Sequence, residues 1–180
     1  LRAKYDGYRF SKQDERIYNP FSLLNTFKRL QFGSYWFETG TPTYLVELLK
    51  QDNYRLPNLT KEVSTADVLN CIDTASNNPI PVLYQSGYLT IKSFDEEFGE
   101  YRLGFPNKEV EEGFTRFLLP YYTGLRNPET PFSMGEFVRD LRSGRPEDFM
   151  QRMATLFADT DYKIVGNSEL YFQNAFYLIA

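Results

Sequence analysis

The residues best placed for chemistry are two threonines and a glycine that precede a predicted helix. Thr39, Gly40 and Thr41 are followed by Pro42, and a proline in the first helical position behind a threonine is typical of a helix start. The free N–H groups of a helix N-terminus attract anions, so this turn could face a phosphate group. The same residues also suit a plain helix cap and tight turn, which is the interpretation that the sequence favours.

The side chains that many enzymes use for catalysis are scarce. The chain of 180 residues has no His and one Cys, which excludes a Ser-His-Asp triad, a Cys-His pair and a His-ligated metal site. It also lacks the phosphate-binding motifs GxxxxGKS/T and GxGxxG, and an acidic strand motif followed by lysine. The sequence therefore offers no self-sufficient catalytic site, and we expect no cofactor in this chain.

Cysteine use and hydropathy indicate the compartment. A single Cys cannot form an intrachain disulfide, which is typical of a protein in the reducing cytoplasm. No apolar run approaches the ~20 residues that cross a membrane, so we predict a cytoplasmic protein without a membrane segment. Cys71 lies in the mostly apolar stretch LNCID, where we expect a small buried side chain rather than a nucleophile.

Three basic residues on or beside a predicted β-hairpin are candidates for nucleic-acid contact: Lys92, Arg102 and Lys108. Binding to DNA draws much of its energy from the neutralisation of phosphates by cations. Residues 86–116, however, hold four cations and seven acids, and the acids crowd the predicted hairpin tip. The charge balance therefore favours contact with a protein, or coupling to another domain, over direct contact with DNA.

Apolar spacing and capping residues predict a mainly helical α+β fold with one small β-hairpin. Near the start, Asp6-Gly7 is a turn pair flanked by aromatic residues, which indicates a further hairpin. Asn19 and Pro20 predict the start of a helix that Gly33 ends. The apolar stripe of that helix comprises Leu23, Leu24, Phe27 and Leu30.

The middle of the chain combines a longer helix with short elements. The helix that starts at Pro42 should bury Leu45, Val46, Leu48 and Leu49. Short helices are expected over 67–72 and 81–86, and the strands of the hairpin over 88–94 and 100–105. Asn107 then caps a helix that Pro120 kinks or stops.

The last third is expected to be helical. Ser133 and Glu136 form a capping box at the start of one helix. Pro146 opens another helix, and a final helix that is apolar nearly all round begins near Ser168.

Five sequence motifs occur in an order that points to a known family. They are YDGYRFS, IYNPFSLLN, YWFETGTPTYLVELLK, PIPVLYQSGYLTIK and YRLGFPNKEVEEGF. Together they resemble the bacterial, Bacteroidetes-type AAA-ATPase-like proteins that carry a C-terminal PD-(D/E)XK nuclease-like domain, and the resemblance covers residues 5–177. It implies that this chain is the middle section of such a protein, with the P-loop ATPase core before Leu1 and the nuclease strands after Ala180.

The resemblance also implies what each part of the chain is. Residues 1–60 would be the helical, lid-like end of the AAA-ATPase-like module. Residues 61–120 would be a winged-helix-type unit whose wing is the hairpin, and residues 121–180 a helical connector to the nuclease-like domain. ATP and Mg²⁺ would belong to the full-length parent rather than to this chain.

Two groups of candidate site residues follow from the resemblance. Asp6 and Arg9 would be polar members of the nucleotide pocket, together with the turn at residues 39–41. Alternatively, Asp6 makes a turn with Gly7 while the neighbouring aromatic residues pack. Glu169, on the last helix, would be the acid that helps to hold a metal in nuclease folds; alternatively, it stabilises the helix N-terminus, since a lone acid binds a metal weakly.

The combined expectation is a non-catalytic regulatory and coupling segment. Its partners would be the upstream ATPase core and the downstream nuclease-like domain of the same parent chain, and DNA is a further candidate partner. The alternatives are a nucleic-acid-binding winged-helix module and a structural protein-interaction domain. Whether the parent hydrolyses ATP or cleaves DNA, and its oligomeric state, stay open at this point.

Overall fold

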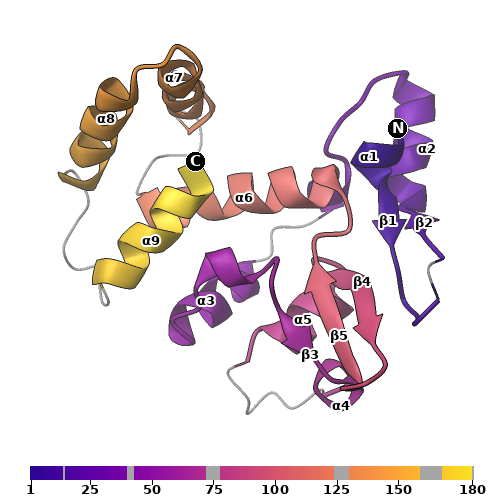
Figure 1. The fold of residues 1–180 in the computed structure, drawn as a ribbon. Coiled ribbons are helices and arrows are strands. Elements are labelled where there is room, and N and C mark those ends of the chain that lie inside the picture. Colours follow the sequence, from indigo (N-terminus) through magenta and orange to yellow (C-terminus); the bar gives the residue numbers. More distant parts are fainter. Residues whose placement is uncertain (14, 40–42, 72–77, 124–129, 159–167, 180) are drawn as a thin grey trace. The chain divides into compact units, whose positions relative to one another are not determined.

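The computed structural model describes residues 1–13, 15–39, 43–71, 78–123, 130–158 and 168–179 (Figure 1). Most of these residues are helical and the strands form two small antiparallel sheets, which confirms the predicted α+β class. They fall into two compact units, residues 1–114 and residues 115–180. No helix among these residues is long and apolar enough to cross a membrane. The division of the chain into residues 1–60, 61–120 and 121–180 stays a prediction.

The chain opens with a short helix and a two-stranded ribbon. Helix α1 (Arg2–Tyr5) is followed by strand β1 (Asp6–Tyr8), which pairs antiparallel with β2 (Ile17–Tyr18). The predicted turn at Gly7 is wrong, because Gly7 lies inside β1. Its φ is +126°, and a Cβ on it would sit 2.1 Å from the carbonyl oxygen of Pro106. The glycine therefore allows two backbones to approach closely rather than making a turn.

The second helix begins where predicted and ends earlier. Helix α2 (Pro20–Arg29) is capped by Asn19, whose side chain accepts hydrogen bonds from two N-terminal N–H groups of the helix. It ends because Leu30 takes a left-handed conformation, with φ of 51°, and not at Gly33. Gly33 instead binds the buried Tyr5 hydroxyl, which donates to its carbonyl oxygen and accepts from its N–H, both at 3.0 Å.

Helix α3 and two short 3₁₀ helices supply apolar packing for the first unit. The elements are η1 (Trp36–Thr39), α3 (Thr43–Gln51) and η2 (Leu56–Asn58). The four predicted core residues of α3 are buried: Leu45, Val46, Leu48 and Leu49. The predicted cap and first residue of this helix, Thr41 and Pro42, lie outside the described residues.

The predicted hairpin is present and belongs to a larger sheet. Strands β4 (Thr90–Asp95) and β5 (Glu100–Gly104) pair antiparallel. Strand β3 (Val63–Ser64) adds to the other side of β5, so the order is β3-β5-β4 (Figure 1). Two short helices, α4 (Ala66–Leu69) and α5 (Ile80–Gln85), come between β3 and β4, close to their predicted positions. The two-residue β3 is too short to give a sequence pattern.

Cys71 is exposed, so the prediction of a buried side chain is wrong. Helix α4 ends at Leu69, its buried residue. The cysteine lies beyond the end of this short helix, and the apolar face does not extend to it.

Aromatic side chains fill the interior of the first unit. The ring of Tyr88 lies 4.8 Å from that of Trp36 and 5.1 Å from that of Phe114, measured between centroids. The ring of Phe105 also contacts Phe114, at 5.7 Å. Tilted and edge-on pairs of this kind stabilise a core beyond the area that they bury.

Helix α6 (Lys108–Thr123) starts at its predicted cap. The side-chain oxygen of Asn107 accepts a hydrogen bond from the N–H of Val110 at 3.1 Å. The helix continues past Pro120 to Thr123, so the proline does not stop it. The boundary between the two units falls within this helix.

The second unit contains helices α7 (Thr130–Arg142), α8 (Pro146–Ala158) and α9 (Ser168–Ile179). Helices α8 and α9 begin at the predicted residues. The capping box predicted at Ser133 is wrong, because α7 begins three residues earlier and Ser133 lies inside it.

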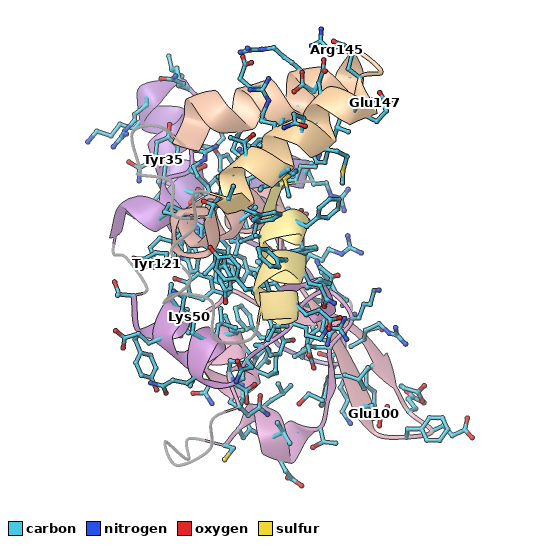
Figure 2. All side chains as sticks on the ribbon, turned by 90° about the vertical axis from the view of Figure 1, so that its left-hand side faces the viewer. Tyr35, Lys50, Glu100, Tyr121, Arg145 and Glu147 are labelled. Carbon is cyan, nitrogen blue, oxygen red and sulfur yellow. The ribbon has the colours of Figure 1, made fainter. Side chains whose placement is uncertain are left out.

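An acidic residue in α7 ties this helix to α8. The buried side chain of Asp140 accepts hydrogen bonds from Arg152 Nε at 2.9 Å and from Arg145 Nη2 at 3.0 Å. Arg145 lies at the connection between the two helices (Figure 2). The guanidinium groups of Arg152 and Arg145 hold the pKa of Asp140 below its usual value.

We expect acid to weaken the second unit through Asp140. Because folding lowers the pKa of Asp140, its ionised form stabilises the fold above the ordinary Asp pKa, and this contribution is lost as the pH falls through the lowered value. Asp140→Asn should therefore lower the melting temperature at pH 7 and lower it less at about pH 3. Circular dichroism melts across this range would measure the difference. Asp148→Asn, at an exposed partner of Arg145, should change the melting temperature little at any pH. A decrease in melting temperature for Asp140→Asn that is the same at every pH would contradict the mechanism.

Candidate functional site

A basic pocket opens in the first unit beside the N-terminal ribbon. It has a volume of about 490 Å³ and is lined by residues of α1, β1 and β4. This size is typical of sites for small ligands. Its charged lining residues are Arg2, Asp6, Arg9, Arg16 and Lys92, and Gly7, Ile91 and Pro106 also line it. The pocket therefore brings together Asp6 and Arg9, both predicted for a nucleotide pocket, and Lys92, which was predicted for nucleic acid.

Reciprocal hydrogen bonds hold the end of β1 beside β4 and so create the pocket. Thr90 Oγ1 accepts from the Arg9 N–H at 2.7 Å and donates to the Arg9 carbonyl oxygen at 2.8 Å. Thr90 is 1% exposed, so water does not compete for these bonds. One buried threonine thus joins two segments that are 81 residues apart in the sequence.

The Arg9 side chain clamps the wall of the pocket. Arg9 is 8% exposed. Its guanidinium group donates hydrogen bonds to the carbonyl oxygens of Gln13 at 2.6 Å, Lys92 at 3.0 Å and Ser11 at 3.2 Å, and also to that of Lys12. These carbonyl groups belong to β4 and to the connection between β1 and β2. Arg9 therefore fixes both segments and places a buried positive charge beside the pocket.

Lys92 lies close to a second cation. Its Nζ donates to the carbonyl oxygen of Pro106 at 3.3 Å. Burial lowers the pKa of Lys92, the charge of Arg16 lowers it further, and Glu111 acts in the opposite direction. Positive charge therefore exceeds negative charge at this end of the pocket.

Asp6 supplies the negative charge of the lining. Its Oδ2 accepts a hydrogen bond from Arg2 Nε at 3.2 Å. The Asp6 side chain is 8% exposed, and its Oδ1 has no hydrogen-bond partner among the described residues. One carboxylate among four cations does not suit Mg²⁺, which binds through oxygen atoms. An anionic group fits this lining better.

Glu169 is not among the residues that line this pocket, and the predicted turn at residues 39–41 is described only in part. Thr39 ends η1, whereas Gly40 and Thr41 lie outside the described residues. Glu169 is exposed near the start of α9 and accepts a hydrogen bond from Gln173 Nε2 at 2.9 Å. The part of the chain that the structure describes contains no group of three or more His, Cys, Asp or Glu residues that could hold a metal ion.

The hairpin carries its exposed acids at the tip, where the sequence places them. Arg102 in β5 and Lys108 at the start of α6 are exposed and are not among the residues that line the pocket. Exposed acids surround the turn between β4 and β5: Asp95, Glu96, Glu97 and Glu100. Figure 2 shows Glu100 toward the far end of this hairpin.

A buried glutamate that the sequence reasoning missed connects three segments of the first unit. Glu109 is 0% exposed, and its Oε1 accepts from Ser22 Oγ at 2.9 Å and from the Trp36 N–H at 3.1 Å. Its Oε2 is buried without a hydrogen-bond partner among the described residues. Burial raises the pKa of Glu109, and the hydrogen bonds from Ser22 and Trp36 oppose this effect.

The spacing of apolar residues gives no signal for Glu109. Val110, Phe114 and Leu118 recur at helical spacing, but neighbouring residues on a helix point about 100° apart, so this pattern does not include Glu109. Glu109 is one of the seven acids of residues 86–116, but it is buried and does not contribute charge to the surface.

Helix α2 presents a second candidate functional surface. Its small polar residues Ser22 and Thr26 face the interior, which reverses the usual arrangement of an amphipathic helix. We call the exposed apolar residues of α2 and of the segment that follows it the α2 surface; these residues, with their exposed fractions, are Phe21 (44%), Leu24 (68%), Phe27 (59%), Leu30 (90%) and Phe32 (59%). Exposed apolar patches of this kind mark interaction sites.

Comparison with known proteins finds a much longer relative. No protein-family model matches the chain, and no solved structure matches it. Over 124 residues the chain is 38% identical to a protein of Azotobacter chroococcum mcd 1 titled "Uncharacterized protein in vnfD 5'region". The match covers 68% of this chain and 24% of that protein, so the chain spans about a quarter of the length of the curated relative that it matches.

Proposed function

We propose that this chain is a non-catalytic regulatory and coupling segment of a longer cytoplasmic protein. In line with the resemblance of its motifs, the parent would be an AAA-ATPase-like protein with a C-terminal PD-(D/E)XK nuclease-like domain. ATP and Mg²⁺ would bind to the ATPase core before Leu1, since this chain has no P-loop motif. Movements of that core would reach the nuclease-like domain through this segment.

The α2 surface is the observation that carries the proposal. A helix with its large apolar side facing outward is suited to pack against another domain. Burial of Leu24 and Phe27 in an interface would contribute about 1.5–3 kcal/mol for each side chain. We assign the upstream ATPase core of the same polypeptide as the occupant, because the matched region is 24% of the relative and much of such a chain lies outside it.

The middle of the chain supports the coupling role. The order β3, α4, α5, β4, β5 and the sheet order β3-β5-β4 are consistent with a winged-helix-type unit over residues 61–120. The exposed acids at the hairpin tip would repel DNA phosphates. The unit is therefore better suited to contact a protein than a nucleic acid.

The α2 surface can be tested by hydrogen exchange in the full-length parent and in residues 1–180. We expect the amides of α2 to exchange at least about tenfold more slowly in the parent, because an interface protects the helix. Leu24→Gln combined with Phe27→Gln should remove that protection. The matched control is Phe98→Gln, at a residue that is 68% exposed in the β4–β5 turn, and it should leave the protection intact.

Four results would overturn parts of the proposal. Equal exchange of α2 in the parent and in residues 1–180 would exclude an interface on this helix. Self-association of residues 1–180 that is lost in the double variant would assign the surface to a second copy. Tight, Mg²⁺-dependent binding of ATP by residues 1–180 alone would contradict a non-catalytic role, and salt-sensitive DNA binding that depends on Lys92, Arg102 and Lys108 would favour the nucleic-acid alternative.

A further inference from the structure

We propose that the basic pocket between α1, β1 and β4 binds the phosphate group of a small phosphorylated ligand. This inference is independent of the α2 surface and of the parent's activity. It rests on the charge, the shape and the rigidity of the pocket.

The charge of the lining is suited to a phosphate. Arg2, Arg9, Arg16 and Lys92 line the pocket with a single carboxylate, that of Asp6. Guanidinium and ammonium groups bind phosphate oxygens through charge-assisted hydrogen bonds, which are stronger than neutral ones. A bound phosphate would relieve the repulsion between Lys92 and Arg16 that contributes to the lowered pKa of Lys92.

The walls of the pocket are held before any ligand arrives. The buried Arg9 side chain bonds to four backbone carbonyl groups on two segments, and Thr90 fixes the Arg9 backbone. A preformed site avoids the cost of ordering loops on binding. Arg2, whose side chain is 79% exposed, and Lys92 provide the groups that can adjust to the ligand.

The size and position of the pocket favour a small ligand over a nucleic acid. A volume of about 490 Å³ suits a molecule such as a sugar phosphate. A DNA backbone, by contrast, needs a row of cations, and the hairpin next to the pocket carries exposed acids at its tip.

The experiment titrates residues 1–180 with inorganic phosphate, ribose 5-phosphate and ribose at constant ionic strength, and follows backbone amide signals by NMR. We expect saturable, roughly millimolar binding of both phosphate compounds at Asp6, Gly7 and Lys92, and none of ribose. Comparing the affinities of the two phosphate compounds distinguishes a site for free phosphate from a site for a phosphate ester. An ester that fills the pocket should bind more tightly than inorganic phosphate.

Charge variants test whether the pocket itself is the site. Lys92→Gln and Arg16→Gln should each weaken phosphate binding at least about tenfold, whereas Asp6→Asn should strengthen it by removing the opposing charge. Lys108→Gln makes the same change of charge outside the pocket and should have no effect. Circular dichroism would confirm that each variant is folded. If one of the two cation variants failed to fold, the other would still test the pocket.

Several outcomes would overturn the proposal. Equal weakening by Lys92→Gln and Lys108→Gln would show non-specific attraction to the surface. Amide shifts that do not saturate, or that lie away from the pocket, would exclude the site. Tighter binding of a DNA duplex than of ribose 5-phosphate, lost in Lys92→Gln, would assign the pocket to nucleic acid.

Discussion

Gly7→Ala is expected to lower the free energy of unfolding of the first unit by about 4 kcal/mol or more. The new Cβ would lie 2.1 Å from the carbonyl oxygen of Pro106, and this atom belongs to the backbone, so no side-chain rotation can relieve the overlap. The φ of +126° adds to the cost, because L side chains rarely adopt it. Urea unfolding followed by the fluorescence of Trp36, the single Trp of the chain and part of the first unit, would measure the loss.

Two other glycines provide matched controls for this substitution. Gly99 also has a positive φ, +67°, but a Cβ there would meet nothing within 4 Å, so Gly99→Ala should cost about 1–2 kcal/mol. At Gly113 a Cβ would lie 2.2 Å from the ring of Phe37, which is a side chain that can move. The cost of Gly113→Ala in unfolding free energy should therefore lie between the costs of Gly7→Ala and Gly99→Ala. If Gly7→Ala cost no more than Gly99→Ala, the approach of β1 to Pro106 would not constrain the fold.

Glu109→Ala is expected to cost about 3 kcal/mol of unfolding free energy. The substitution removes the acceptor that the buried Ser22 hydroxyl and the Trp36 N–H share, and a buried donor that loses its acceptor costs about 1–3 kcal/mol. Glu109→Gln keeps an acceptor oxygen for both donors and should cost less than about 1 kcal/mol near neutral pH. The same urea experiment distinguishes the two variants.

The pH dependence of stability provides a second readout for Glu109. Burial raises its pKa in the folded state, so the protonated form is favoured by folding. The resulting stabilisation is complete below the ordinary Glu pKa and is lost as the pH rises through the raised value. Glu109→Gln should abolish this decline, whereas Glu112→Gln, at an exposed residue of the same helix, should retain it. Equal costs for Glu109→Ala and Glu109→Gln would show that the two hydrogen bonds do not hold the segments together.

Local signals predicted the starts of helices well. Asn19 with Pro20, Asn107 and Pro146 each mark a helix start in the structure, because a cap acts on N–H groups two or three residues away. Elements that depend on distant partners were harder to predict. Strand β3 exists because β5 pairs with it, and Gly7 is required by Pro106, which is far away in the sequence.

The sequence predicted only part of the candidate site, because contacts between distant segments bring some of its residues together. Asp6 and Arg9 stood out in a motif of aromatic and polar residues, and both line the pocket. Arg2 and Arg16 were not singled out, because no local pattern indicates that the chain returns to place them beside Lys92. The reversed polarity of α2 was also hidden, since spacing shows that a helix has an apolar side but not which side the protein covers.

The bond between Arg9 and Thr90 has a consequence for synthesis on the ribosome. The pocket cannot close until Thr90 has emerged, which at about 5–20 residues per second is roughly 4–16 seconds after Arg9. The residues of α2 emerge before Thr90, and the phenylalanines of this helix are exposed even in the folded chain. A nascent chain that stalls before Thr90 would therefore present α2 to chaperones, and translation speed over residues 30–90 should govern how much of the chain they capture.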